Sequence, residues 1–153
     1  MHEWTEGEYC ISTDRARLDL DVIHAGLDRS YWASGIPRDV IVRSIAGSLC
    51  FGLYHAQRQI GFARVISDGA TFAYLSDVFV REEYRGRGIG QWFIRTIVAH
   101  PQLQGLRRWL LATRDAHGLY RKFGFRELEC PEIYMEMVRP DAYRAPPDSH
   151  PPR

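Results

Sequence analysis

The spacing of hydrophobic positions along the chain changes repeatedly between a helical and a strand-like period. Ile89, Trp92, Phe93 and Ile97 recur at the spacing of one face of an amphipathic helix, which predicts a helix ending near residue 100. Residues 71–80 read TFAYLSDVFV, a run rich in aromatic and β-branched residues that is typical of a strand. The chain therefore combines both kinds of element.

Applied to the whole chain, the same patterns predict the order β-α-α-β-β-β-α-β-α-β-β. The strand–helix–strand unit from Thr71 to Thr113 predicts a parallel pair with a right-handed crossover, and the other strands are expected to be antiparallel or mixed. We therefore expect an α/β (α+β) fold with a central mixed sheet flanked by helices. The expected strands are 7–13, 49–56, 59–67, 71–80, 106–113, 125–129 and 133–138, and the expected helices are 14–29, 37–47, 89–100 and 115–125.

Length and composition indicate one ordinary globular domain, because 45% of the 153 residues are hydrophobic and 25% are charged. We expect the domain to cover residues 1–138 and the Pro-rich, polar residues 139–153 to form a flexible tail. The net charge of +1 gives no general attraction to nucleic acid or to membranes. No stretch is apolar enough to span a bilayer, and the first residues lack an apolar secretory segment.

The cysteines and histidines suggest neither disulfides nor a metal site. Three cysteines are far apart and contain no CxxC pair, which favours reduced thiols in a cytoplasmic protein. Six histidines are dispersed without the spacing of metal ligands, so no metal is expected.

A glycine-rich turn, EYRGRGIGQW, joins the strand over 71–80 to the helix that follows. Backbone N–H groups at a helix start lack intrahelical partners and carry the positive end of the helix dipole, so the turn predicts a phosphate site. Glycines let a ligand approach the backbone, and Arg85 and Arg87 can add charge-assisted hydrogen bonds. The GxGxG spacing fits neither a Walker A loop, which needs a Lys, nor the GxGxxG dinucleotide fingerprint.

The pattern Arg85-x-x-Gly88-x-Gly90 resembles the acyl-CoA loop, Gln/Arg-x-x-Gly-x-Gly/Ala, of the GCN5-related N-acetyltransferases (GNAT). LSDVFVREEYRGRGIG is similar to the central strand and loop of that family, and RRWLLATRDAHGLYRKFGF is similar to its next strand and helix. The element order matches over about residues 7–138. The residues of the second stretch that follow the family pattern are Ala116, Leu119, Tyr120, Gly124 and Phe125.

The resemblance implies the GNAT fold and an acyltransferase that moves the acetyl group of acetyl-CoA directly to a primary amine of a small molecule, peptide or protein. The reaction would pass through a tetrahedral intermediate and need no metal. A bulge in the central strand would point the N–H of Val78 or Phe79 at the thioester oxygen. The residues implied to bind the cofactor are Val78, Phe79, Val80, Arg85, Gly86, Arg87, Gly88, Ile89, Gly90 and Thr113.

The strand end at Thr113 departs from the family pattern, because the family often has there an Asn that contacts the cofactor. The hydroxyl of Thr113 can substitute for that amide, and Asp115 nearby can serve as a helix cap only.

Two residues are candidates for catalysis. Tyr120 matches the usual general acid of the family, which would protonate the leaving thiolate. Asp77 precedes the expected bulge, and plain alternation places it on one face with Leu75 and Phe79. A carboxylate on a buried strand is costly unless it is paired or functional, so Asp77 is a candidate general base, a site for a cationic substrate, or the partner of an Arg.

Acceptor recognition is expected in the stretch RSYWASGIP, where Tyr31 and Trp32 either line an amine pocket or form a hydrophobic plug between the helices and the sheet. Neither the acceptor nor the preferred acyl length follows from the sequence, and both a monomer and a homodimer remain open. The alternative function is a non-catalytic acyl-CoA-binding or regulatory module on the same fold. A nucleic-acid binder is disfavoured because Glu82 and Glu83 interrupt the arginines.

Overall fold

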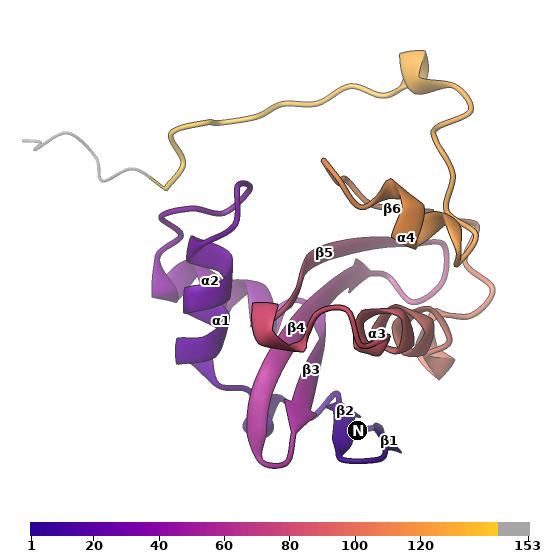
Figure 1. The fold of residues 1–153 in the computed structure, drawn as a ribbon. Helices are drawn as coiled ribbons and strands as arrows, with labels where there is room; N and C mark the ends of the chain where they lie inside the picture. Colours follow the sequence, from indigo (N-terminus) through magenta and orange to yellow (C-terminus); the bar gives the residue numbers. More distant parts are fainter. Residues whose placement is uncertain (144–153) are drawn as a thin grey trace, which may run out of the picture.

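The computed structural model describes residues 1–143, which form a six-stranded sheet with helices on both faces (Figure 1). The strand order is β1-β2-β3-β4-β5-β6, and every neighbouring pair is antiparallel except β5 and β6, which are parallel. The mixed α/β fold and the parallel pair expected from the sequence are thereby confirmed. The strands are β1 (Glu3–Glu6), β2 (Tyr9–Ser12), β3 (Leu49–His55), β4 (Arg58–Ser67), β5 (Phe72–Val80) and β6 (Arg108–Leu110), and the helices are α1 (Leu20–Asp28), α2 (Arg38–Ala46), α3 (Ile89–Val98) and α4 (His117–Arg121).

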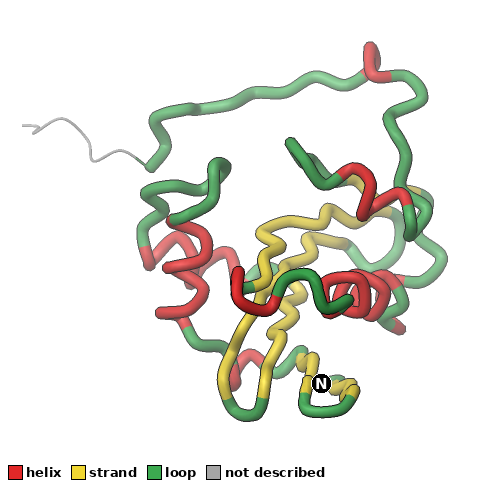
Figure 2. Tube along the Cα trace, in the orientation of Figure 1, coloured by secondary structure: helices red, strands yellow, loops and turns green. Residues whose placement is uncertain are grey.

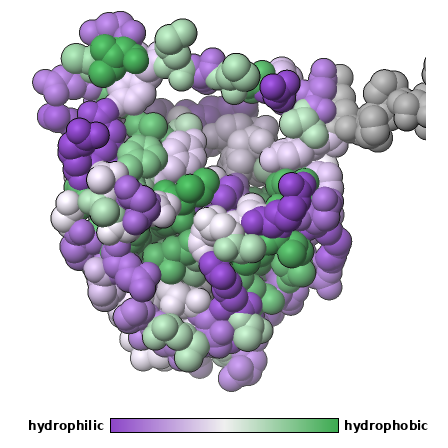
Figure 3. Space-filling view, turned by 180° about the vertical axis from the view of Figure 1, so that it is seen from behind, coloured by the Kyte–Doolittle hydropathy of each residue, from purple (hydrophilic) through white to green (hydrophobic). Residues whose placement is uncertain are grey.

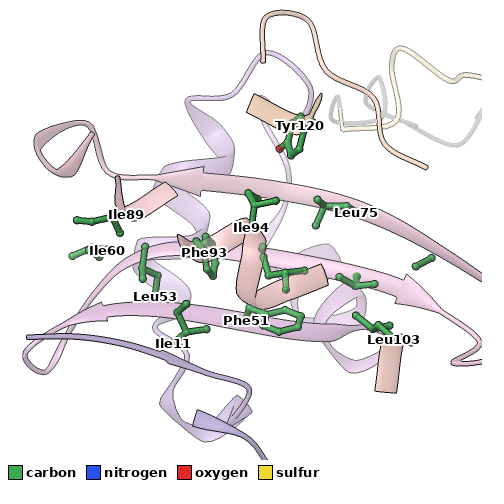
Figure 4. Close-up of a cluster of buried hydrophobic side chains, with 14 residues drawn as sticks. Ile11, Phe51, Leu53, Ile60, Leu75, Ile89, Phe93, Ile94, Leu103 and Tyr120 are labelled. Atoms are coloured by element: carbon green, nitrogen blue, oxygen red, sulfur yellow. The ribbon is translucent and has the colours of Figure 1, made fainter. Parts of the chain in front are cut away.

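Helix α3 covers one face of the sheet through the apolar stripe that the sequence predicted. Phe93, Ile94 and Ile97 are almost fully buried and belong to the same cluster as Phe51 and Leu53 of β3 (Figure 4). Burial of each such side chain contributes about 1.5–3 kcal/mol, so this cluster fixes the position of α3 against the sheet.

Helices α1 and α2 cover the opposite face. Their buried residues Ile23, Leu27 and Ile41 pack in a second cluster with Phe62 of β4. The connection between these two helices therefore lies on the side of the sheet opposite α3.

The N-terminal segment forms two short strands where the sequence predicted one. Instead of one strand over 7–13, the chain forms a hairpin of β1 and β2, which turns at Gly7 with φ +58°. The polar residues of β1 carry no hydrophobic pattern, because this strand lies at the edge of the sheet with its residues mostly exposed.

The first helix starts later than the sequence suggested. Asp14 caps only a short 3-10 turn over Arg15–Arg17, and the side chain of Asp19 accepts hydrogen bonds from the N–H groups of Asp21 and Val22 to cap α1. The helix expected over 14–29 therefore begins at Leu20, after the Asp19 cap.

The two strands expected over 125–129 and 133–138 do not form within residues 1–143. The chain after α4 instead runs mostly as an extended segment, with a 3-10 turn at Pro131–Ile133 and a further turn over 140–143 (Figure 2). Met135 is 98% exposed, so the apolar residues that suggested a strand have no partner here. The predicted tail over 139–153 falls mostly on residues 144–153, which lie outside the described residues.

No helix within residues 1–143 has the combination of length and apolarity that a transmembrane span requires.

Candidate active site

The glycine turn adopts a backbone that only glycine accepts easily. Gly86 and Gly88 have φ values of +78° and +77°, and Gly88 is the residue that precedes α3. No side chain caps α3, so the first N–H groups of the helix are left for a ligand. A β-carbon added at Gly86, Gly88 or Gly90 would meet no atom within 4 Å, which means that this face of the turn is open.

The two arginines of the turn are placed differently. Arg85 donates from Nε to the backbone carbonyl of Val80 at 3.1 Å, whereas the guanidinium of Arg87 lies 5.5 Å from the centre of the Tyr84 ring. Arg85 therefore fixes the turn against the end of β5, whereas the guanidinium of Arg87 makes no hydrogen bond within the described part of the chain and is available to a ligand.

Strands β5 and β6 are paired over only three positions, Phe72–Tyr74 with Arg108–Leu110. Beyond Tyr74, β5 continues to Val80 and reaches the glycine turn, while the chain after Leu110 leaves the ladder. Residues 75–80 consequently have no strand on this side within residues 1–143. Their free backbone groups can pair with an extended ligand in the manner of an added strand.

A bulge interrupts β5 at the point where the resemblance to acetyltransferases implied one. The register with β4 passes from Phe62↔Phe79 to Arg64↔Ser76, so Asp77 and Val78 together oppose one residue. Asp77 has φ +57°, which is uncommon for a residue other than glycine.

The bulge also changes which face each side chain reaches. Leu75, Val78 and Val80 pack in the cluster under α3, whereas Phe79 packs with the α1–α2 cluster. The prediction that Asp77 shares a face with Leu75 is wrong, because strict alternation ends at the bulge. The ring of Phe79 occupies the space beside Gly26 of α1, where a β-carbon would come within 2.3 Å of it.

Asp77 is buried and both of its carboxylate oxygens are engaged. Oδ2 accepts from Arg64 Nε at 2.8 Å, and Oδ1 accepts from Trp32 Nε1 at 3.0 Å. The side chains of Asp77 and Arg64 are only 7% and 15% exposed. Arg64 also donates to the hydroxyl of Ser48 at 3.1 Å, so the pair is embedded in further hydrogen bonds.

Arg64 was not singled out from the sequence, although the signal was present. It is the one charged residue in the otherwise apolar run QIGFARVIS, and a charge in a buried strand indicates a partner nearby.

A cavity of about 430 Å³ lies next to this pair. Its walls come from the loop between α1 and α2, from β5, and from the connection between β6 and α4. The predicted site residues that line it are Tyr31, Trp32, Asp77, Val78, Thr113 and Tyr120. The structure therefore brings together residues up to 89 positions apart in the sequence.

Tyr31 and Trp32 close one side of this cavity and remain about half exposed. Their rings meet edge to face with centroids 5.0 Å apart. The hydroxyl of Tyr31 accepts a hydrogen bond from the N–H of Arg114 at 2.8 Å, and the Arg114 guanidinium stacks 3.9 Å from the Tyr31 ring centre. Tyr31 therefore connects the α1–α2 loop to the β6–α4 connection across the cavity mouth.

Tyr120 lies at the margin of the core cluster (Figure 4). Its side chain also lines the cavity. Only 8% of the residue is exposed, and its ring packs edge to face against Phe125 at 5.8 Å. Burial, with a smaller effect from Tyr31, raises the pKa of Tyr120 to about 12. The phenol is therefore protonated at neutral pH and can act as a proton donor.

The side chain of Thr113 forms a hydrogen bond in the turn that precedes α4. Its Oγ1 accepts from the N–H of Ala116 at 3.1 Å, whereas Asp115, the cap expected from the sequence, makes no such bond within residues 1–143. The hydroxyl proton of Thr113 is left to donate to a ligand in the cavity.

No group of three or more His, Cys, Asp and Glu side chains within residues 1–143 is arranged to hold a metal ion.

The open strand edge, the bulge, the glycine turn and the buried tyrosine belong to β5 and to the elements that follow it on a mixed sheet. Residues 46–127 match the family model of the acetyltransferase (GNAT) domain, and the chain belongs to the GNAT family of acyltransferases. A Gibberella zeae protein named as an acetyltransferase is 37% identical, over 78% of this chain and 79% of that protein.

Solved structures agree with this assignment. The crystal structure of a GNAT-family acetyltransferase from Xanthomonas campestris pv. campestris is 49% identical, has a TM-score of 0.86, and covers 90% of this chain and 97% of that one. An acetyltransferase from Clostridium acetobutylicum, solved with acetyl-CoA, shares the fold at 15% identity and a TM-score of 0.61, over 85% of this chain and 94% of that one.

Proposed function

We propose that this acyltransferase moves the acetyl group of acetyl-CoA to a primary amine of a small molecule, peptide or protein. The observation that carries the proposal is the unpaired edge of β5, which runs from the Tyr120 cavity to the open glycine turn. The related Clostridium acetobutylicum structure holds acetyl-CoA on the same fold, which supports this choice of acyl donor.

In this proposal, the diphosphate of acetyl-CoA is held by the backbone N–H groups from Arg85 to Gly90, with added hydrogen bonds from Arg87. The pantetheine arm pairs with the backbone of residues 78–80. Because the bulge at Asp77 and Val78 frees ladder groups there, the N–H of Val78 or Phe79 can donate to the thioester oxygen. A donor of this kind stabilises the tetrahedral oxyanion by about 3 kcal/mol.

The amine nitrogen attacks the thioester carbonyl carbon, and the carbon–sulfur bond then breaks. Tyr120 gives its phenolic proton to the departing CoA sulfur, which its raised pKa of about 12 allows because the phenol is not ionised beforehand. The proton lost by the amine passes to solvent through the cavity mouth, where Tyr31 and Trp32 are about half exposed.

The contacts of Asp77 favour a positioning role over proton transfer. Its two oxygens already accept from Arg64 and Trp32, so accepting the amine proton would require one of these bonds to break. We infer that Asp77 orients the Trp32 indole as a wall of the acceptor site, with Tyr31 as the neighbouring wall.

A thiol-release assay with acetyl-CoA and a panel of primary amines tests the proposed function. Turnover with at least one amine supports it, and release of CoA must match formation of the acetylated amine. Tight binding of acetyl-CoA without turnover on any amine class would instead favour the non-catalytic acyl-CoA-binding module.

The pH dependence of Asp77→Asn separates the two roles of this carboxylate. A positioning residue predicts a lower kcat/KM with an unchanged pH midpoint, because the ionisation that limits the rate belongs to the amine. A midpoint that moves or disappears in Asp77→Asn, with the wild-type midpoint independent of the amine, would restore Asp77 as the general base.

A further inference from the structure

Arg87, the arginine of the glycine turn whose guanidinium is available to a ligand, has one contact that restrains it. Hydrophilic side chains occupy much of the rim of the face drawn in Figure 3, so exposure alone does not distinguish Arg87 from other surface arginines. Its guanidinium lies 5.5 Å from the centre of the Tyr84 ring. A cation is attracted to the face of an aromatic ring, so Tyr84 limits the positions that this guanidinium takes.

The side chain of Tyr84 is itself held at both its ring and its hydroxyl. Tyr84 ends the 3-10 turn over Glu82–Tyr84, directly before Arg85 and the glycine turn. Its ring packs against the core cluster under α3. Its hydroxyl lies 2.9 Å from Nδ1 of His55, the last residue of β3. Tyr84 is therefore anchored to the sheet at two points.

A carboxylate decides which way the bond between Tyr84 and His55 runs. Nε2 of His55 lies 3.0 Å from Oε2 of Glu8, in the turn between β1 and β2. An ionised carboxylate only accepts, so Nε2 carries the proton of the neutral imidazole and Nδ1 is the acceptor. The hydroxyl of Tyr84 therefore donates to Nδ1. A phenol that donates a hydrogen bond gains electron density, which strengthens the attraction of its ring for a guanidinium.

Tyr9 completes this cluster of rings. It is the cross-strand partner of His55, and the two rings stack with centroids 4.9 Å apart. The rings of Tyr9 and Tyr84 meet edge to face at 6.3 Å, and those of His55 and Tyr84 at 5.3 Å. Three rings in mutual contact restrict one another, so His55 is not free to turn away from the Tyr84 hydroxyl.

We propose that Tyr84 and His55 are positioning residues for the diphosphate of acetyl-CoA, because they hold the Arg87 guanidinium in place before the ligand binds. This role rests on the proposed function, in which Arg87 adds hydrogen bonds to that diphosphate. A free arginine side chain loses rotamer freedom when it binds a ligand, and a side chain that is already restrained loses less. Tyr84 and His55 act through Arg87 and need not touch the ligand.

Binding of CoA and of pantetheine to the full chain tests this role. Pantetheine lacks the diphosphate and the nucleotide, so the ratio of the two dissociation constants measures what these groups add to affinity. Calorimetry measures CoA, and ligand-observed NMR measures the weaker pantetheine. In Tyr84→Leu, which removes the ring, we expect CoA to bind about fivefold more weakly and pantetheine to bind as in the wild type. A substitution that only loosened the fold would weaken both ligands.

A double variant tests whether Tyr84 acts through Arg87. Arg87→Gln removes the charge, and we expect it to weaken CoA binding about tenfold. Adding Tyr84→Leu to Arg87→Gln should then change the affinity no further, because the ring has no guanidinium left to hold.

Two variants of His55 test the hydrogen bond and leave the Tyr84 ring in place. His55→Asn keeps an acceptor oxygen near the position of Nδ1, so it should retain the wild-type affinity for CoA. His55→Leu has no acceptor, and we expect it to weaken CoA binding about threefold. These variants also keep the test open if Tyr84→Leu does not fold.

Tyr54→Phe is the matched control. Tyr54 precedes His55 on β3, and the guanidinium of Arg17 lies 4.3 Å from the centre of its ring. The hydroxyl of Tyr54 has no hydrogen-bond partner within residues 1–143. The control therefore removes a hydroxyl from a tyrosine that also contacts an arginine, and it should leave the affinity for CoA unchanged.

The outcomes separate this role from the proposed function. A wild-type chain that binds CoA no more tightly than pantetheine would overturn both the diphosphate site and the role of Tyr84. If the wild type prefers CoA and Tyr84→Leu keeps that preference, only the positioning role is overturned. The same follows if Tyr84→Leu weakens both ligands equally, or if its effect persists in Arg87→Gln. Equal affinities of His55→Leu and His55→Asn for CoA would overturn the part of His55.

Discussion

Tyr120 has a buried ring and a hydroxyl that reaches a cavity. Removing only the hydroxyl therefore tests its part in the reaction without disturbing the packing of the ring. We expect Tyr120→Phe to lower kcat about 100-fold, because a lost general acid typically costs a factor of this order or more. The KM for acetyl-CoA and the unfolding free energy should change little, since the Phe ring keeps the contact with Phe125. Steady-state thiol-release kinetics and urea unfolding provide the two measurements.

The pKa of the same residue makes the pH profile informative. Because burial raises the pKa of Tyr120 to about 12, the phenol stays protonated through the alkaline range in which amines lose their protons. The wild-type kcat should therefore rise with pH and show no falling limb before the protein itself unfolds. A falling limb near the ordinary tyrosine pKa of 10 would contradict the raised pKa of Tyr120, and its persistence in Tyr120→Phe would exclude Tyr120 as the acid.

Replacing one partner of the Asp77–Arg64 pair is expected to lower the free energy of unfolding strongly. Replacing both partners together is expected to lower it much less. In Asp77→Asn the Arg64 guanidinium stays buried without a counter-charge, and we expect a loss of about 3 kcal/mol in unfolding free energy. The double variant Asp77→Asn with Arg64→Gln should lose less than the sum of the two single variants. Urea unfolding of all four proteins checks this, and strictly additive losses would contradict a coupled pair.

At the scale of elements, the glycine turn predicts different outcomes for two adjacent glycines. Gly88 has φ +77°, so Gly88→Ala should cost about 1 kcal/mol of stability and weaken acetyl-CoA binding by at least tenfold as the turn rearranges. Gly90 lies inside α3, and its added β-carbon meets no atom within 4 Å. Gly90→Ala should therefore stabilise the protein by about 0.5 kcal/mol.

Calorimetric titration with acetyl-CoA and thermal unfolding measure both variants, and Gly90→Ala serves as the control for Gly88→Ala. Equal effects of the two substitutions on affinity would mean that the φ of Gly88 is not what shapes the site.

The elements that the sequence predicted well are those in which local pattern and tertiary contact agree. The stripe of α3 is helical in period and buries Ile89, Phe93 and Ile97 as expected, with Trp92 partly buried beside them. The glycine turn has the left-handed backbone that its composition suggested. The alternation of apolar and polar residues could not predict the bulge at Asp77. One extra residue in β5 reverses which face of the sheet the later side chains reach. Its presence was implied only by the resemblance to acetyltransferases.

The strands at the two ends of the chain were predicted wrongly for different physical reasons. β1 was missed because an edge strand with exposed, polar residues has no hydrophobic pattern. The strands over 125–129 and 133–138 were predicted from a real alternation that finds no ladder within the described chain. A pattern can state that a segment is suited to a sheet, but it does not identify the strand with which the segment pairs.

For the whole molecule, one buried histidine predicts how stability depends on pH. His100 is 1% exposed and lies among Trp4, Phe51 and His2, and its Nε2 has no hydrogen-bond partner within residues 1–143. Burial, with smaller effects from His2 and the N-terminus, lowers the pKa of His100 below its ordinary value of 6.5.

Because the folded pKa lies below the unfolded one, the unfolded chain binds this proton more readily. The contribution of His100 to stability is complete above pH 6.5 and is lost as the pH falls from there through the folded pKa. In His100→Gln, which can still accept from the N–H of Gln102, unfolding free energy should depend less on pH between about 5 and 7. Urea unfolding at a series of pH values tests this, and parallel curves for the two proteins would contradict it.

The three-position ladder between β5 and β6 has a mechanical consequence. Beyond this ladder, the N–H groups of Arg107 and Arg108 donate to the Thr71 carbonyl just before β5, and the N–H of Arg114 donates to the Tyr31 hydroxyl at the cavity. A unit held by so few backbone bonds is expected to open locally before the rest of the fold, and its amides should exchange with deuterium first. The β6–α4 unit would then move as a hinged flap when a long, thin co-substrate enters. The hydrogen bonds at Tyr31 and at Thr71 would set the free energy of that opening.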